Sequence, residues 1–183
     1  MGGAGVEIVS LADVHVDADA VNVIEDGATF EENAVKKAVA YAKASGLPAL
    51  SDDSGLEIDF LGKRPGVHSA RFLGADTPYS HKNREIIRML ADAPEGARTA
   101  RFVSVVAFCG GAGGDVLTAR GVIEGEIAHE TRGVNGFGYD PIFFLKDLGL
   151  CMAELPPEQK NAISHRGQAL RKLYGALVNN GVI

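Results

Sequence analysis

The stretch that most constrains the fold is LPALSDDSGLEIDF, at residues 47–60. A short apolar run leads into a group of serines and acids, and a second strand-like run follows at residues 56–61. This order predicts a buried strand that ends in acidic residues. Neighbouring side chains on a strand point to opposite faces, so Asp52 and Asp53 serve one site only if the strand has broken at Ser54. We expect one carboxylate to do chemistry and the other to support the loop; an ordinary Asp-Asp-Ser-Gly turn is the alternative.

The composition indicates a globular domain and argues against several classes of binding protein. A chain of 183 residues, 46% of them hydrophobic, fits one domain, with room for two lobes. The net charge of -6 argues against broad electrostatic binding to nucleic acid or to anionic membranes, so a polyanionic ligand needs a local basic cluster or a metal. The two cysteines form no CxxC pair, which predicts neither a disulfide framework nor a zinc site. We expect a reduced, cytosolic protein without a signal peptide or membrane span.

The first half of the chain contains one well-marked helix. Thr29 and Glu32 have the capping-box spacing and Gly46 suits a helix C-terminus, so a helix is predicted at about residues 30–45. Lys37 lies on this helix, where a solvated surface lysine is the simpler interpretation. Weak alternation at residues 6–11 predicts a strand.

The middle of the chain predicts a helix and two strands. Thr77 and Pro78 precede a helical pattern whose basic residues, Lys82, Arg84 and Arg88, we expect on a solvated face. Residues 101–109 and 116–127 are extended, and GGAGG between them indicates a flexible hairpin connection rather than a phosphate loop.

Two later segments suggest a ligand site. In NGFGYDP, residues 135–141, two glycines alternate with two aromatics and an acid, which suits a flat ligand; a hydrophobic loop is the alternative. Ser164 is the predicted N-cap of the last helix, so His165 and Arg166 fall in its first turn. Cations there oppose the helix dipole, which together with Lys160 indicates a negative ligand nearby.

The segments TFEENAVKKA, LSDDSGL, PGVHSAR, NGFGYDPIF and AELPPEQKNAISHRGQAL occur in this order and resemble the inosine/xanthosine triphosphate pyrophosphatase family. The resemblance covers the chain from about Val6 onwards. It implies hydrolysis of deaminated purine nucleoside triphosphates (ITP, dITP and XTP) to the monophosphate and pyrophosphate. It also implies an α/β fold with an elongated, bent mixed sheet flanked by helices, two lobes with a central substrate cleft, dependence on Mg2+ and a homodimer.

The resemblance assigns roles to particular residues. Asp53 matches the acid that binds magnesium and activates water, although the residues themselves leave Asp52 open as the base. Glu25 matches the second metal acid, and Lys37 a lysine that faces the phosphates. The remaining substrate contacts implied are Ser54, Phe137, Gly138, Tyr139, Asp140, Lys160, His165 and Arg166. Specificity is expected from His165 or Arg166 donating to the purine 6-oxo group, which adenine lacks.

One family element has no match in this chain. Members begin with a strand and a Ser/Thr-x-Asn-x-x-Lys loop, and nothing before Val6 resembles it, so we expect a single pyrophosphatase domain, residues 1–183, without its first strand and phosphate loop. Two other functions follow as alternatives. One is a catalytically weak purine-nucleotide-binding protein, and the other is a related pyrophosphatase for modified pyrimidine nucleotides.

Overall fold

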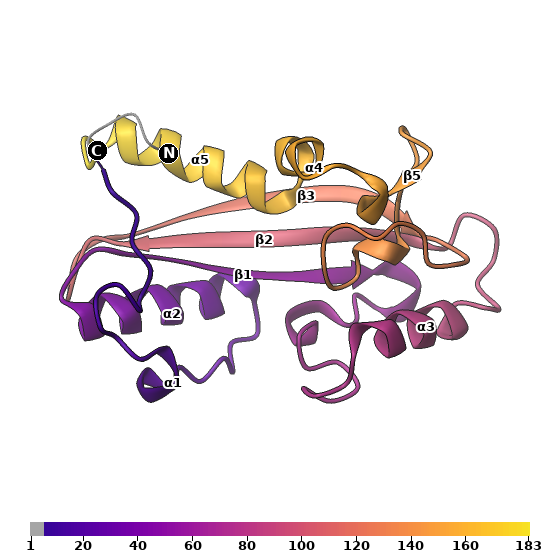
Figure 1. Cartoon of the computed structure of the whole chain (residues 1–183), viewed down its shortest axis with the longest axis horizontal. Coiled ribbons are helices and arrows are strands. Elements are labelled where there is room, and N and C mark those ends of the chain that lie inside the picture. Colours follow the sequence, from indigo (N-terminus) through magenta and orange to yellow (C-terminus); the bar gives the residue numbers. More distant parts are fainter. Residues whose placement is uncertain (1–5) are drawn as a thin grey trace. The chain divides into compact units, whose positions relative to one another are not determined.

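The computed structural model describes residues 6–183, in which helices flank a five-stranded sheet (Figure 1). The strands lie in the order β1-β2-β3-β4-β5. Their bounds are Ala49–Ile58 for β1, Thr99–Cys109 for β2, Val116–Ile127 for β3, Phe143–Leu145 for β4 and Leu150–Cys151 for β5. The helices are Ala18–Val21 (α1), Phe30–Ser45 (α2), Tyr79–Met89 (α3), Pro157–Ile163 (α4) and His165–Asn179 (α5).

The α/β class predicted from the sequence is confirmed, and the strand pairing is antiparallel rather than mixed. Glu126 of β3 lies opposite Phe144 of β4, and Leu145 of β4 lies opposite Leu150 of β5. Connection length explains two of the pairings. Residues 110–115 join β2 to β3 and residues 146–149 join β4 to β5, and a parallel pair would need a crossover of a dozen or more residues.

The chain divides into two compact units. Unit 1 comprises residues 1–53, 104–121 and 168–183, and unit 2 comprises residues 54–103 and 122–167. Strands β1, β2 and β3 each contribute residues to both units. In unit 1, α5 packs Ala169 and Leu173 against Val106 of β2. In unit 2 the core joins Leu56 and Ile58 of β1 to residues of α3, β2 and β4.

The predicted strand at residues 6–11 is wrong. This segment is irregular and enters a turn at residues 11–15, where the Asp13 carboxylate accepts hydrogen bonds from the backbone N–H and the hydroxyl of Ser10, at 2.8 and 2.6 Å. Ile8 is 66% exposed and Val9 is 45% exposed. The alternating pattern therefore does not bury one face, which is what a stable strand requires. The sequence expectation about the missing N-terminal element concerns Met1–Gly5, which lie outside the described residues.

Helix α2 forms as its end signals predict. The Thr29 hydroxyl accepts the Glu32 N–H at 3.1 Å, and Gly46 ends the helix in the left-handed conformation at φ 71°. Its buried face is largely alanine, with Ala34 fully buried. Small side chains let a neighbouring backbone approach, and the Ser51 hydroxyl of β1 donates to the Ala34 carbonyl at 2.6 Å. This bond ties the acidic strand to α2.

Strand β1 runs without a break through the acids, which corrects the expectation that it ends at Ser54. In unit 1, Ser51 and Asp53 are buried, whereas Leu50 is 42% exposed and Asp52 is half-buried. Adjacent positions on an unbroken strand face opposite sides of the sheet. Asp52 and Asp53 therefore project in opposite directions.

Helix α3 contains one side chain that the sequence placed wrongly. Arg84 and Arg88 are exposed as predicted, but Lys82 is only 1% exposed. Its ammonium donates to the Ala70 carbonyl at 2.6 Å and lies 4.8 Å from the centre of the Tyr79 ring. The carbonyl and the ring replace part of the water that a solvated lysine would keep.

Arg98 joins three backbone segments of unit 2. It is 8% exposed, and its guanidinium donates to the carbonyls of Ile127, Leu90 and Ala128 at 2.7, 2.8 and 2.8 Å. We expect Arg98→Ala to lower the free energy of unfolding by about 3 kcal/mol or more, because it removes the guanidinium donor from three carbonyls, of which that of Leu90 also accepts the Ala93 N–H. Urea denaturation measures the loss. Arg98→Lys should recover only part of it, since an ammonium cannot reproduce the planar fork; a lysine variant as stable as the wild type would contradict this.

Candidate active site

Two carboxylates in unit 1 converge on one lysine. The Lys37 ammonium, from α2, lies 3.1 Å from Asp53 Oδ1 and 3.3 Å from Glu25 Oε2. Asp53 is 9% exposed, and the Lys37 side chain is 14% exposed. We call Glu25, Lys37 and Asp53 the acid cluster. Lys37 is therefore not a solvated surface lysine, and the two acids lie close enough to contact the same cation.

Asn33 orients Asp53, and sequence reasoning did not identify it as a site residue. Its Nδ2 donates to Asp53 Oδ2 at 3.3 Å, and its Oδ1 accepts the Gly27 N–H at 2.8 Å. A Cβ at position 27 would lie 2.6 Å from that Oδ1, so only glycine fits there. The available signal was the spacing of four between Asn33 and Lys37, which puts both on one face of α2.

Burial dominates the electrostatics of the acid cluster. Desolvation raises the pKa of Asp53 above its usual range, while Lys37 and the Asn33 amide act to lower it and the Glu25 charge adds to the rise. The buried carboxylate is thus only partly compensated by the side chains around it. A further positive charge next to Asp53 would favour its ionised form.

The oxygens of this cluster suit a magnesium ion shared with a substrate. Within residues 6–183, no three His, Cys, Asp or Glu side chains are grouped closely enough to hold a metal ion on their own. Magnesium commonly binds through one or two carboxylates while phosphates and water fill its other positions. Glu25 and Asp53 fit that arrangement, and they do not fit a site built entirely from protein ligands.

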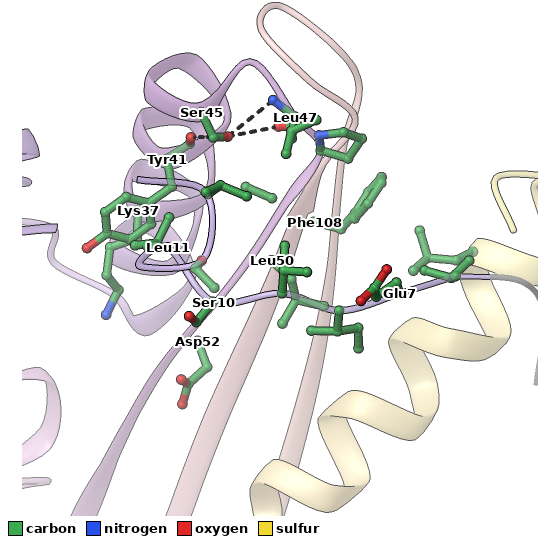
Figure 2. Close-up of a pocket in the computed structure, with 18 of the residues that line it drawn as sticks. Glu7, Ser10, Leu11, Lys37, Tyr41, Ser45, Leu47, Leu50, Asp52 and Phe108 are labelled. Carbon is green, nitrogen blue, oxygen red and sulfur yellow. Dashed lines mark hydrogen bonds between the residues drawn. The ribbon is translucent and has the colours of Figure 1, made fainter. Parts of the chain in front are cut away.

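A cavity of about 640 Å³ lies beside the acid cluster in unit 1. Its wall includes Lys37 and Tyr41 of α2 and Leu50 and Asp52 of β1, and Figure 2 shows Ser10 and Leu11 of the N-terminal segment beside them. Asp52 lines this cavity, whereas Asp53 belongs to the acid cluster. The two acids therefore have different surroundings.

Unit 2 contains a second group of predicted site residues. Asp140 is 3% exposed, accepts the Phe137 N–H at 2.7 Å and forms an ion pair with Lys160 of α4. A Cβ at Gly136 would lie 2.2 Å from Asp140 Oδ2. The Asp140 carboxylate therefore occupies the space in which a side chain at position 136 would lie. We call residues 135–140 the aromatic loop.

The two aromatic side chains of this loop have different surroundings. Phe137 is 63% exposed, and its ring carries the Lys160 ammonium at 4.5 Å and the Arg166 guanidinium at 5.6 Å. Tyr139 is 4% exposed, and its hydroxyl donates to the Ser69 carbonyl at 2.7 Å. Burial raises the pKa of Tyr139 far above its usual range. Of the two rings, Phe137 is therefore the one positioned to stack on a ligand.

The start of α5 is built as predicted. The Ser164 hydroxyl accepts the Gly167 N–H at 3.1 Å, which confirms Ser164 as the N-cap. His165 is 8% exposed and stacks on Phe102 of β2, with ring centres 4.8 Å apart. Ser54, the first residue of unit 2 on β1, is half-buried.

The sequence pattern of the Ham1 family matches residues 1–176. This chain belongs to the Ham1 family. Among its Ham1 relatives, the dITP/XTP pyrophosphatase of Exiguobacterium sibiricum is 47% identical over 177 residues, which cover 97% of this chain and 87% of that protein. The dITP/XTP pyrophosphatase of Escherichia coli O157:H7 is 44% identical over 96% of this chain and 87% of its own length.

Solved structures of Ham1 proteins agree in fold with this chain. A HAM1 protein from Coxiella burnetii superposes with a TM-score of 0.81 at 43% identity, covering 92% of this chain and 89% of that one. The dITP/XTP pyrophosphatase of Mycobacterium abscessus gives a TM-score of 0.74 at 42% identity, with coverage of 93% and 87%. None of the helices in residues 6–183 of this Ham1 chain combines the length and the apolar character of a membrane span.

Proposed function

We propose that this chain hydrolyses deaminated purine nucleoside triphosphates, dITP, ITP and XTP, to the monophosphate and pyrophosphate. The observation that carries the proposal is the 47% identity, over 97% of the chain, to a protein named dITP/XTP pyrophosphatase. The acid cluster supports it, because two carboxylates and a lysine are the side chains that such a hydrolysis requires. The relatives give no support to the alternative of a weak nucleotide-binding protein.

The acid cluster is assigned to the phosphates. Asp53 takes a proton from water as the water oxygen bonds to the α-phosphorus, and the bond from that phosphorus to the bridging oxygen breaks, releasing pyrophosphate. Lys37 offsets negative charge on the phosphate oxygens. Glu25 and Asp53 would hold Mg2+, which supplies charge neutralisation to the substrate when bound. The partly compensated burial of Asp53 supports this assignment, since added positive charge favours its ionised form.

The aromatic loop is assigned to the purine. Phe137 offers an exposed ring for stacking, and Lys160 and Arg166 lie against that ring. The backbone of the loop includes Gly138, and the loop is held in place by the side chains of Tyr139 and Asp140. His165 or Arg166 donates to the 6-oxo group of the deaminated base, and Ser54 adds a further substrate contact. Adenine has an amino group at that position and would leave the donor unpaired.

We also propose that the whole chain acts as one Mg2+-dependent pyrophosphatase domain, as a cytoplasmic homodimer that binds neither nucleic acid nor membrane. The two-carboxylate donor set supports the metal, and the net charge of -6 supports the absence of nucleic-acid binding. Activity that persists in excess EDTA would contradict the metal requirement. Sedimentation equilibrium that returns the monomer mass would contradict the dimer, and cell fractionation checks the compartment.

The substrate class is tested by turnover of dITP, ITP and XTP against ATP. We expect kcat/KM for the deaminated nucleotides to exceed that for ATP by about 100-fold or more, because a buried donor left unpaired by adenine discriminates strongly. Release of pyrophosphate with Mg2+ present is the measurement. Equal turnover of dITP and dATP would remove the proposed specificity, and absence of turnover for every purine would remove the activity.

A further inference from the structure

We propose that Asn83 of α3 is a positioning residue that orients the aromatic loop and thereby contributes to the choice of base. This proposal rests on the proposed function of the loop. Asn83 is 2% exposed, and its Nδ2 donates to the Gly138 carbonyl at 3.1 Å. It is not among the residues that the family resemblance points to, and it lies in another element, more than fifty residues away in the chain from the loop it contacts.

Helix α3 contacts the loop through one face. Tyr79 and Asn83 are four residues apart, so they lie on the same side of the helix. The Tyr79 ring meets the Tyr139 ring edge to face, with centres 5.1 Å apart, and a Cβ at Gly138 would lie 3.6 Å from Tyr79 Cε1. Gly138 itself has φ +67°, in the left-handed region. An aromatic contact and a hydrogen bond from one face of α3 therefore converge on Gly138 and its neighbour Tyr139.

The side-chain oxygen of Asn83 is evidence against a purely structural role. Among the residues that the structure describes, Asn83 Oδ1 has no hydrogen-bond partner, although the atom is buried. A buried acceptor without a partner destabilises the folded state. A leucine has a similar shape and would avoid that penalty. What the amide provides and leucine does not is a donor for the Gly138 carbonyl.

Holding that carbonyl has a consequence for substrate binding. The peptide bond between Gly138 and Tyr139 is planar, so fixing the direction of the Gly138 C=O also fixes the Tyr139 N–H on the opposite side. Backbone N–H groups are donors, which suit the 6-oxo oxygen of a deaminated purine and not the 6-amino group of adenine. Asn83 thus sets the direction of a donor in the segment assigned to the base.

The test compares Asn83→Leu with Ser104→Ala. Ser104 is a matched control because its hydroxyl is also buried and has no hydrogen-bond partner within the described part of the chain. For Asn83→Leu we expect KM for dITP to rise about 3- to 10-fold, the loss of one hydrogen bond. The ratio of kcat/KM for dITP to that for dATP should fall by a similar factor. We expect kcat and the melting temperature of Asn83→Leu to stay close to the wild-type values, and Ser104→Ala to leave KM, kcat and the ratio unchanged.

An equal fall in kcat/KM for dITP and for dATP, together with a lower melting temperature, would show a merely structural role and overturn the proposal. An unchanged KM and ratio in a folded Asn83→Leu protein would overturn it as well. Should the leucine variant not fold, Asn83→Ala removes the same donor without added bulk and is judged by the same outcomes.

A second measurement separates this proposal from the proposed function. Amide hydrogen exchange at residues 137–140, without nucleotide, should be faster in Asn83→Leu than in the wild type and unchanged in Ser104→Ala. This result does not depend on any activity. If dITP is not hydrolysed but exchange in the loop is faster, the proposed function fails while the positioning role stands; unchanged exchange overturns the positioning role alone.

Discussion

Asp53→Asn should lower kcat for dITP by about 10²- to 10⁴-fold, the range that a positioned general base contributes. Asparagine keeps the shape of aspartate but cannot take a proton from water. The variant should stay folded, because desolvation already raises the pKa of Asp53 and so disfavours its charge, and the cost is limited to the one acceptor oxygen that asparagine lacks for Lys37 or Asn33. Single-turnover hydrolysis of dITP and a thermal melt measure the two effects.

Asp52→Asn is the matched control for this variant. Asp52 is the neighbouring acid on β1, projects to the opposite side of the strand and lines the cavity rather than the acid cluster. We expect its kcat to remain within a few-fold of the wild type. A large loss in Asp52→Asn with an active Asp53→Asn would reverse the assignment of the base.

Lys160→Ala should lower the free energy of unfolding by about 3–5 kcal/mol, as expected when one partner of a buried ion pair is removed. The reason is that Asp140 is 3% exposed and would lose the ammonium that compensates its charge. The same change should raise KM for dITP, because Lys160 also lies over the Phe137 ring. Urea denaturation and steady-state kinetics measure the two consequences separately.

The double variant Lys160→Met with Asp140→Asn separates the effect of Lys160 on the free energy of unfolding from its effect on dITP binding. It removes both charges, so we expect most of the lost unfolding free energy to return. Binding should stay weak, since the ammonium over Phe137 is still absent. If Lys160→Ala alone is as stable as the wild type, the buried pair does not hold the aromatic loop, and the role of Lys160 is limited to the substrate.

Several elements could be predicted from the sequence because they depend on residues close together in the chain. The bounds of α2 follow from Thr29 and Gly46, which satisfy backbone groups within one turn. The Ser164 cap is equally local. Strand β3 matches the predicted residues 116–127, since a hairpin pairs neighbours in sequence. The five family segments are also local patterns, and their order was sufficient to indicate the Ham1 relationship that the comparisons established.

What depends on distant contacts was decided only by the tertiary structure. Lysine is usually a surface residue, so the sequence predicts that Lys82 is exposed. Only its contacts with the Ala70 carbonyl and the Tyr79 ring explain why it is buried. The sequence does not show which of the two aromatic rings, Phe137 or Tyr139, is buried. In the structure it is Tyr139, whose hydroxyl donates to the Ser69 carbonyl. Asn33 and Asn83 acquire their roles from partners 20 and 55 residues away. The physical reason is that local signals specify where an element begins and ends, whereas burial, pKa and hydrogen-bond partners are set by whatever the fold brings next to a side chain.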